Sequence, residues 1–113
     1  MTAYAIASLR TVDVNEEILD YLERIDATLE PYAGRFLVHG AVPEVIDGDL
    51  PGAVVVIAFP DVATAHAWYD SPAYQEILPL RLRNSTGGAV IVDGVAEGYT
   101  AAGYAAKVRQ LTG

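Results

Sequence analysis

The residues best suited to chemistry gather in one stretch of the sequence, AWYDSPAYQEILPLRLRNSTG, at positions 67–87. Arg81 could bind an anionic or carbonyl oxygen, because a guanidinium presents a rigid fork of N–H donors. Tyr69 and Tyr74 could donate hydrogen bonds to the same oxygen and stabilise charge that develops on it. These types suit an apolar pocket with a few polar groups placed in it. An ion pair with Glu76 or Asp70 explains Arg81 equally well.

Three more residues of this stretch are candidates for contact with a small-molecule substrate: Trp68, Ser71 and Ser85. Packing in the core is the simpler interpretation of Trp68. Ser71 precedes a proline, so a role as helix N-cap explains it completely, and it lacks the G-x-S-x-G context of a nucleophile. Ser85 either caps the end of the segment or points into the pocket.

The chain has two histidines, of which His39 is the better candidate for a catalytic role. His39 follows an expected strand and could act as a general base, because its unperturbed pKa lies near neutrality. The alternative is a partly exposed histidine at a turn. His66 is expected on the opposite side of a helix from Trp68, nearer to solvent. No H-E-x-x-H spacing or comparable ligand set occurs, so we expect no metal site.

Composition excludes several classes of protein. The chain has 113 residues, of which 52% are hydrophobic, which predicts a folded domain with its own core. It has no cysteine, which excludes thiolate nucleophiles and cysteine-bound metals, and we expect no cofactor. The net charge of −8 argues against nucleic acid or an anionic membrane as a partner. Neither a secretory signal nor a membrane-spanning apolar run is visible, so we expect a cytoplasmic protein.

Hydrophobic periodicity and turn residues predict the order of the elements. The expected elements are a strand over 3–12, a helix from an N-cap at Asp13 to Pro31, a strand over 35–40, a short strand and turn-rich loop over 43–52, a strand over 53–60, a helix over 61–70 capped by Asp61, a helical segment from Ser71 that Pro79 kinks or divides, and a strand over 89–94. This β-α-β-β-α-β order is typical of the ferredoxin-like α+β fold, in which helices cover one face of an antiparallel sheet.

A distinct tail follows this domain, so we divide the chain into a ferredoxin-like domain at 1–94 and a helical extension at 95–113. An apolar stripe at helical spacing predicts the tail helix: Ala101, Tyr104, Ala105, Val108 and Leu111. This stripe must pack either on its own domain or across a dimer.

The strand over 53–59, AVVVIAF, is apolar on both of its faces. One of these faces would lie on the side of the sheet that no helix covers. Burial of each such side chain stabilises by about 1.5–3 kcal/mol, and an uncovered apolar patch usually marks an interface. A second copy related by two-fold symmetry is the simplest cover, so we expect a homodimer.

Three segments together, PYAGRFLVHG, VVIAFPD and AWYDSPAYQEILPLRLRNSTGGAVIVDG, resemble the domain-of-unknown-function 1330 family. The resemblance covers about Tyr4 to Gly94. It implies membership of the dimeric α+β barrel superfamily, with paired sheets and a cavity between sheet and helices. Related families of that superfamily include cofactor-free monooxygenases, lactone isomerases, polyketide cyclases and haem-degrading enzymes.

Two hypotheses for function follow. The first is a cofactor-independent enzyme on a small, partly apolar organic molecule, with His39, Tyr69 and Arg81 in catalysis. The second is a homodimer without catalysis, which binds a ligand or serves as a structural assembly. The fold alone does not choose between them, because one fold hosts many functions.

Overall fold

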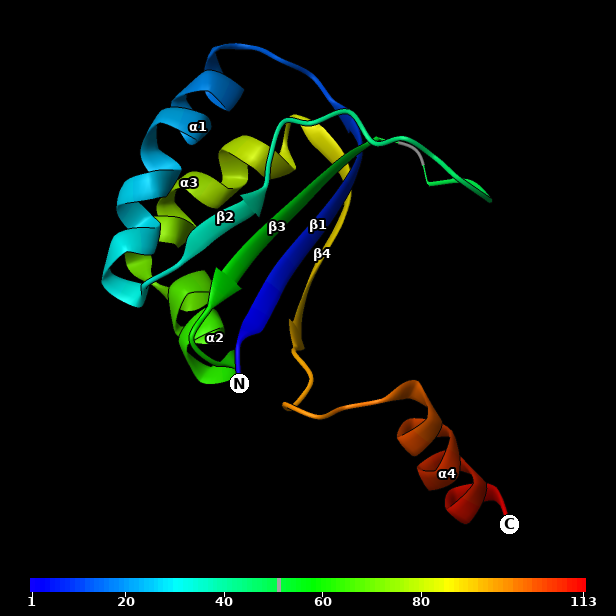
Figure 1. Ribbon diagram of the computed structural model, residues 1–113. Helices are drawn as coiled ribbons and strands as arrows, with labels where there is room; N and C mark the ends of the chain where they lie inside the picture. Colours follow the sequence, from blue (N-terminus) through cyan, green and yellow to red (C-terminus); the bar gives the residue numbers. More distant parts are fainter. Residues whose placement is uncertain (51) are drawn as a thin grey trace.

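Two layers make up the main body in the computed structural model of the chain, which describes residues 1–50 and 52–113 (Figure 1). The elements are β1 (Ala3–Val12), α1 (Glu16–Leu29), a 3-10 turn η1 (Glu30–Tyr32), β2 (Arg35–Val38), β3 (Ala53–Phe59), α2 (Val62–Asp70), α3 (Pro72–Leu82), β4 (Ser85–Asp93) and α4 (Ala101–Thr112). The sheet order is β2-β3-β1-β4, and every neighbouring pair is antiparallel. The predicted ferredoxin-like α+β fold with an additional C-terminal helix is therefore confirmed.

The start of α1 differs from the prediction. Asn15 is its N-cap, and the Asn15 Oδ1 accepts a hydrogen bond from the Ile18 N–H at 3.1 Å. Asp13 instead belongs to the connection from β1, where its backbone N–H donates to the Asn84 carbonyl at 2.7 Å. Both side chains are good caps, so the tertiary bond to Asn84 decided between them.

The two other predicted caps are confirmed. The Asp61 carboxylate accepts from the Thr64 N–H at 2.7 Å, and the Ser71 Oγ accepts from the Tyr74 N–H at 3.3 Å. Helix α3 continues through Pro79 to Leu82 as one element, so the second short helix that was considered does not form.

Strand β4 begins at Ser85, four residues before the predicted start. Gly87 lies inside it, pairs with Leu9 and has a φ of 129°. A Cβ at Gly87 would stand 2.1 Å from the Ser8 carbonyl oxygen, so only glycine fits this register shift. The predicted strand over 89–94 left out Gly87 and Gly88, whereas the structure includes both, and Gly87 permits the bulge. The strand expected within 43–52 does not occur at residues 43–50, and Pro51 is outside the described residues.

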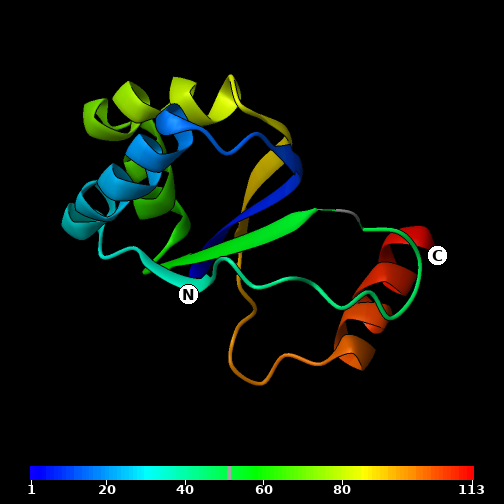
Figure 2. The same ribbon diagram turned by 90° about the horizontal axis from the view of Figure 1, so that it is seen from above.

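Helices α1, α2 and α3 lie together against one face of the sheet (Figure 2). The core between these layers includes Tyr21, Ile25, Leu29, Ile57, Phe59, Ala65, Trp68, Tyr74, Ile77 and Leu78. The helical spacing of Ile18, Leu22, Ile25 and Leu29 predicts that Leu22 belongs to the core stripe of α1, whereas Tyr21 points inward and Leu22 is 39% exposed. The apolar stripe of α1 is thus rotated slightly from the one that the sequence favoured.

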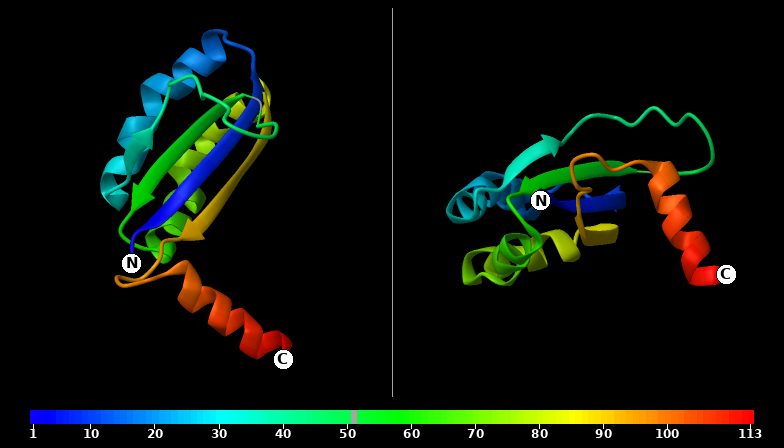
Figure 3. Two further views of the ribbon diagram at one scale, coloured as in Figure 1. Left: turned by 45° about the vertical axis from the view of Figure 1, so that its right-hand side comes forward. Right: turned by 60° about the horizontal axis from the view of Figure 1, so that its bottom comes forward.

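The other face of the sheet has no helix over it among the described residues (Figure 3). Val38, Val90 and Val92 remain exposed. Helix α4 projects away from the sandwich, and none of its residues is buried (Figure 1). The alternative in which this helix packs on its own domain is therefore not observed. None of the described helices combines the length and apolar character that a membrane crossing requires.

Candidate functional site

A cleft of about 750 Å³ lies between the helices and the sheet, and it is lined by residues of all four strands and of α1, α2 and α3. Part of its floor is made of small side chains, because Ala7 pairs with Ala89 across β1 and β4, and Ala5, on the same face of β1, lies beside them. Methyl groups are too short to fill the space below α1. The alternation of the strands therefore produces a hollow where larger residues would have produced a core.

Two tyrosines and an arginine form the polar centre of this cleft. The Tyr21 and Tyr74 hydroxyl groups share a hydrogen bond of 2.8 Å and are both buried. Burial raises the pKa of Tyr21, the Tyr74 hydroxyl adds to this, and the Arg81 guanidinium beside the pair opposes it in part. Burial disfavours the charge on Arg81, but the two tyrosine oxygens outweigh it, and the pKa of Arg81 is raised. At neutral pH the centre therefore holds a neutral tyrosine at position 21 and a cation.

The ion pair considered as an alternative for Arg81 does not form. Within residues 1–50 and 52–113, the ion pairs join Arg24 to Asp20 and Glu76, and Arg83 to Glu17. Arg81 is half-buried and lines the cleft, with hydroxyl groups rather than a carboxylate as its polar neighbours.

Trp68 closes the cleft at its packed end. Its ring lies 4.1 Å from that of Tyr74 and 5.3 Å from that of Phe59, between centroids. The Trp68 indole N–H donates to the Thr28 Oγ1 at 3.0 Å. Trp68 is therefore a core residue that also forms a cleft wall, and its only N–H donor is already used.

The other candidates of this stretch separate into two groups. Tyr69 is half-buried and lines the cleft, with its ring 5.6 Å from Tyr74. Ser85 also lines the cleft, and its Oγ donates to the Arg81 carbonyl at 2.7 Å, which fixes the turn that carries Arg81. Ser71 is outside the cleft lining, and its Oγ donates to the Trp68 carbonyl at 2.7 Å as well as capping α3. The structure gives Ser71 a structural role and does not bring it to the ligand space.

His39 reaches the cleft through an irregularity in β2. Phe36 pairs with Ile57, but Val38 pairs with Val56, so one extra residue separates them. Strict alternation along 35–40 predicts His39 on the same side of the strand as Arg35 and Leu37, and this bulge ends that alternation. The His39 ring instead stacks on Phe36, with centroids 4.5 Å apart and planes at 13°, and it is exposed at the cleft wall.

His66 is exposed, as expected from its position opposite Trp68 on α2, yet it borders the cleft together with Asp70. Within the part of the chain that the structure describes, no group of three or more histidine, aspartate or glutamate side chains is arranged to hold a metal ion.

Tyr21 is the functional residue that sequence reasoning missed. It follows Ile18 by three positions and precedes Ile25 by four, so it fits a helical stripe as well as Leu22 does. A tyrosine on an apolar stripe is a usable signal, because a buried hydroxyl needs a partner. Its partner Tyr74 is 53 residues away, and only the tertiary structure shows it.

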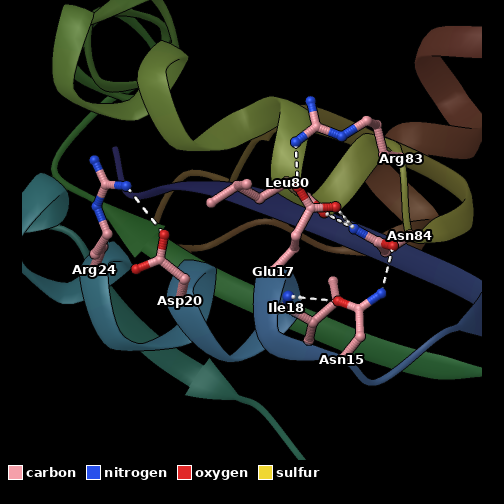
Figure 4. A network of polar contacts seen from close by, with 8 residues as sticks. All are labelled: Asn15, Glu17, Ile18, Asp20, Arg24, Leu80, Arg83 and Asn84. Carbon is pink, nitrogen blue, oxygen red and sulfur yellow. Dashed lines mark hydrogen bonds and ion pairs between the residues drawn. The ribbon is translucent and has the colours of Figure 1, made fainter.

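A polar network holds the two helices of the cleft roof at their ends (Figure 4). Asn84 Nδ2 donates to the Glu17 Oε1 at 3.0 Å and to the Leu80 carbonyl at 2.7 Å. Asn15 Nδ2 donates to the Asn84 Oδ1 at 2.6 Å, and Arg83 pairs with Glu17. This network joins the start of α1 to the end of α3, and so it fixes the distance between the Tyr21 and Arg81 backbones.

The strand order, the one-sided helices and the cleft between the layers define a ferredoxin-like α+β protein. The chain belongs to the family described as domain of unknown function (DUF1330), whose model matches residues 2–95. No curated protein matches the chain. Helix α4 lies outside the matched residues.

Solved structures share this fold at low sequence identity. A protein of unknown function from Rhodopseudomonas palustris has a TM-score of 0.63 and 15% identity, over 84% of this chain and 83% of that one. A dimeric ferredoxin-like protein of unknown function from Jannaschia sp. CCS1 has a TM-score of 0.61 and 15% identity, over 85% and 100%. A cofactor-independent oxygenase from Streptomyces nogalater has a TM-score of 0.53 and 13% identity, over 88% and 96%. At these identities the likeness establishes the common fold.

Proposed function

We propose that this protein is a homodimer that binds a small, partly apolar organic molecule in the cleft and transforms it without a cofactor. The observation that carries the proposal is the cleft, which is apolar except for a few converging polar groups. The oxygenase from Streptomyces nogalater supports it, because that protein performs cofactor-independent chemistry on the same fold.

The chemistry that suits the cleft is proton transfer next to a carbonyl group. Arg81 and Tyr74, with Tyr69 beside them, would hold the substrate oxygen. His39, at the cleft wall, would accept the proton from carbon, and the electron pair of the broken C–H bond would move to the oxygen as an enolate. Return of the proton to a different carbon completes an isomerisation. Attack by the enolate carbon on a second carbonyl carbon of the same molecule completes a cyclisation, in which the electron pair of that C=O bond moves to its oxygen and the proton on His39 is transferred to the alkoxide.

Binding of small phenols and lactones, followed by ligand-observed NMR, tests the proposal. The Ala7→Leu variant is the matched control, because a larger side chain on the floor fills the cleft without removing a polar group. We expect binding by the wild type that Ala7→Leu abolishes. Equal binding by both proteins would show that the cleft is not the ligand site.

A second candidate is a homodimer that binds a ligand without turning it over. It is favoured by the exposure of His39, for which the described residues provide no side-chain hydrogen bond that would orient its ring. Turnover of a bound ligand separates the two. Loss of turnover in His39→Gln at unchanged ligand affinity would establish catalysis. If the wild type turns over no ligand that it binds, the second candidate, a binding protein without catalysis, is supported.

The homodimer is proposed through the uncovered face of the sheet, where Val38, Val90 and Val92 are exposed. The Jannaschia protein of the same fold is dimeric. Sedimentation at micromolar concentration should give twice the chain mass, and a Val90→Lys variant should give a folded single chain, because it buries an unpaired charge in the interface.

A further inference from the structure

An unpaired cation inside the cleft indicates the charge of its ligand. Arg81 is half-buried, and the carboxylates that form ion pairs within the described chain serve Arg24 and Arg83 instead. The chain has fifteen acidic residues, yet none of them forms an ion pair with Arg81 within residues 1–50 and 52–113. The polar neighbours of Arg81 are the Tyr21 and Tyr74 hydroxyl groups rather than a carboxylate, so a ligand oxygen with negative charge can supply the counterion that the described residues do not.

The tyrosine pair beside Arg81 adds a donor to this cation. Burial keeps the Tyr21 hydroxyl protonated at neutral pH by raising its pKa. In the 2.8 Å bond between Tyr21 and Tyr74, one hydroxyl donates to the other, and one proton is left to donate outward. A cation and a neutral donor on one side of an apolar space fit an oxygen that carries negative charge.

We propose that the ligand is an organic anion, whose carboxylate, enolate or phenolate oxygen lies against Arg81 and the Tyr21–Tyr74 pair while its apolar body lies over the alanine floor. This inference rests on the proposed function of the cleft and adds the charge of the ligand and the residues that recognise it. Neutral phenols and lactones would then bind only as weak surrogates.

Calorimetry with 2-naphthoate and its neutral counterpart 2-naphthamide tests the charge directly. The wild type should bind the naphthoate about tenfold more tightly or better. Arg81→Met should lose this preference and retain the naphthamide affinity. Arg24→Gln is the matched control, because it removes one positive charge from a partly exposed, ion-paired arginine of α1 that is not part of the cleft lining, and it should change neither affinity.

The outcomes separate this inference from the proposed function. Equal affinity of the wild type for both probes, or a preference that survives in Arg81→Met, overturns the anion site and leaves the cleft as a ligand site. Binding of neither probe to the wild type overturns both. If Arg81→Met fails to fold, Arg81→Lys replaces it, because lysine keeps the positive charge without the paired N–H donors of the guanidinium. An unchanged naphthoate affinity in Arg81→Lys would support recognition by charge.

A different observation concerns two exposed segments outside the sandwich. Helix α4 has an apolar stripe with Tyr104 58% and Leu111 82% exposed, and helical geometry places Lys107 and Arg109 on either side of this stripe. The loop over 41–50 exposes four aliphatic residues, among which lie three acids: Val42, Val45, Ile46 and Leu50, with Glu44, Asp47 and Asp49. One segment is thus apolar and basic, and the other is apolar and acidic.

These two segments lie at opposite ends of the sheet, so they do not meet within one chain (Figures 1 and 3). A two-fold axis that runs across the strands places one end of a sheet beside the opposite end of its partner's sheet. We infer that α4 of each copy packs on the 41–50 loop of the other copy and so clasps the homodimer, on which this inference rests.

Cysteine pairing tests the clasp, because the chain has no cysteine of its own. Proteins with Ile46→Cys and with Leu111→Cys should form a covalent dimer when mixed and oxidised, whereas Ala27→Cys in the helix layer should not link to Leu111→Cys. A double variant that gives only an internally linked single chain would overturn the clasp, since the helix would then fold back on its own loop.

Charge reversal gives an independent measure. Lys107→Glu with Arg109→Glu should weaken the dimer about tenfold, and Glu44→Lys with Asp49→Lys in the same chain should restore it. A wild-type dimer that is unchanged by reversal and forms no cross-link would overturn the clasp but not the dimer. A wild type that sediments as a single chain would overturn both.

Discussion

The two ends of the sheet have the same backbone arrangement, but side chains fill the space under the helices at one end and leave a cleft at the other. At the end where β3 finishes, Ala3, Phe59, Ala65 and Trp68 are at most 3% exposed and fill the space between the layers. Toward the end where β4 begins, the floor of Ala7 and Ala89 leaves the cleft. The backbone alternation is the same at both ends, so the size of the side chains decides where there is a core and where there is a ligand space.

The largest expected effect is at the packed end. Trp68→Ala should lower the free energy of unfolding by about 3–5 kcal/mol, because it leaves a cavity and deprives the Thr28 hydroxyl of its N–H partner. Urea denaturation measures this. Trp68→Phe keeps most of the ring and should cost clearly less; an equal cost would mean that the indole N–H, not packing, carries the stability.

Adding volume should separate the two ends. Ala65→Leu at the packed end should lower the free energy of unfolding by about 1–3 kcal/mol, because Ala65 is fully buried within the hydrophobic core. Ala7→Leu should change it by less than about 1 kcal/mol, since the side chain enters the cleft. The same urea titration compares them, and equal losses would show that the cleft does not accept a side chain.

The network that holds the roof should have a smaller effect. Asn84→Ala removes hydrogen bonds to Glu17 and to the Leu80 carbonyl, and should lower the free energy of unfolding by about 1 kcal/mol. Gln110→Ala on exposed α4 is the control and should have no measurable effect. Because the network spaces Tyr21 from Arg81, Asn84→Ala should also weaken naphthoate binding, which a purely local loss of stability would not do.

The smallest effect is the pH dependence of this network. Hydrogen bonds from Arg83 and Asn84 hold the pKa of Glu17 below its ordinary value. The unfolded chain then binds a proton more readily than the folded one, so the contribution of Glu17 is present above the ordinary glutamate pKa, about 4.3, and is lost as the pH falls. Thermal unfolding of the wild type and Glu17→Gln should therefore differ near neutral pH and converge in acid, and a constant difference would contradict this.

Most helix and strand positions could be predicted from the sequence, because the signals that set them act over a few neighbouring residues. Asp61 and Ser71 were identified as caps from their neighbours alone, and the structure confirms both. Errors arose where two local choices were equal. Asn15 rather than Asp13 caps α1, and Gly87 lies inside β4, because contacts with Asn84 and with Ser8 on distant segments decided them.

The candidate site was predicted in part for the same reason. Arg81, Tyr69 and Tyr74 lie close in sequence and line the cleft together. Tyr21 could not be assigned, because two stripes of α1 were almost equally apolar and only packing against α3 rotated one of them inward. His39 was placed on the wrong side of its strand, because a bulge has no local signature in RFLVHG.

By itself, the sequence determined the order of the elements, the ferredoxin-like architecture and the separate tail helix, because periodicity, caps and turn residues act along the chain. Only the tertiary structure decided that small residues of β1 and β4 lie side by side under a hollow, that Tyr21 meets Tyr74, and that Arg81 forms no ion pair within the described residues. Those facts depend on which distant side chains share a space, and that is fixed only when the layers pack.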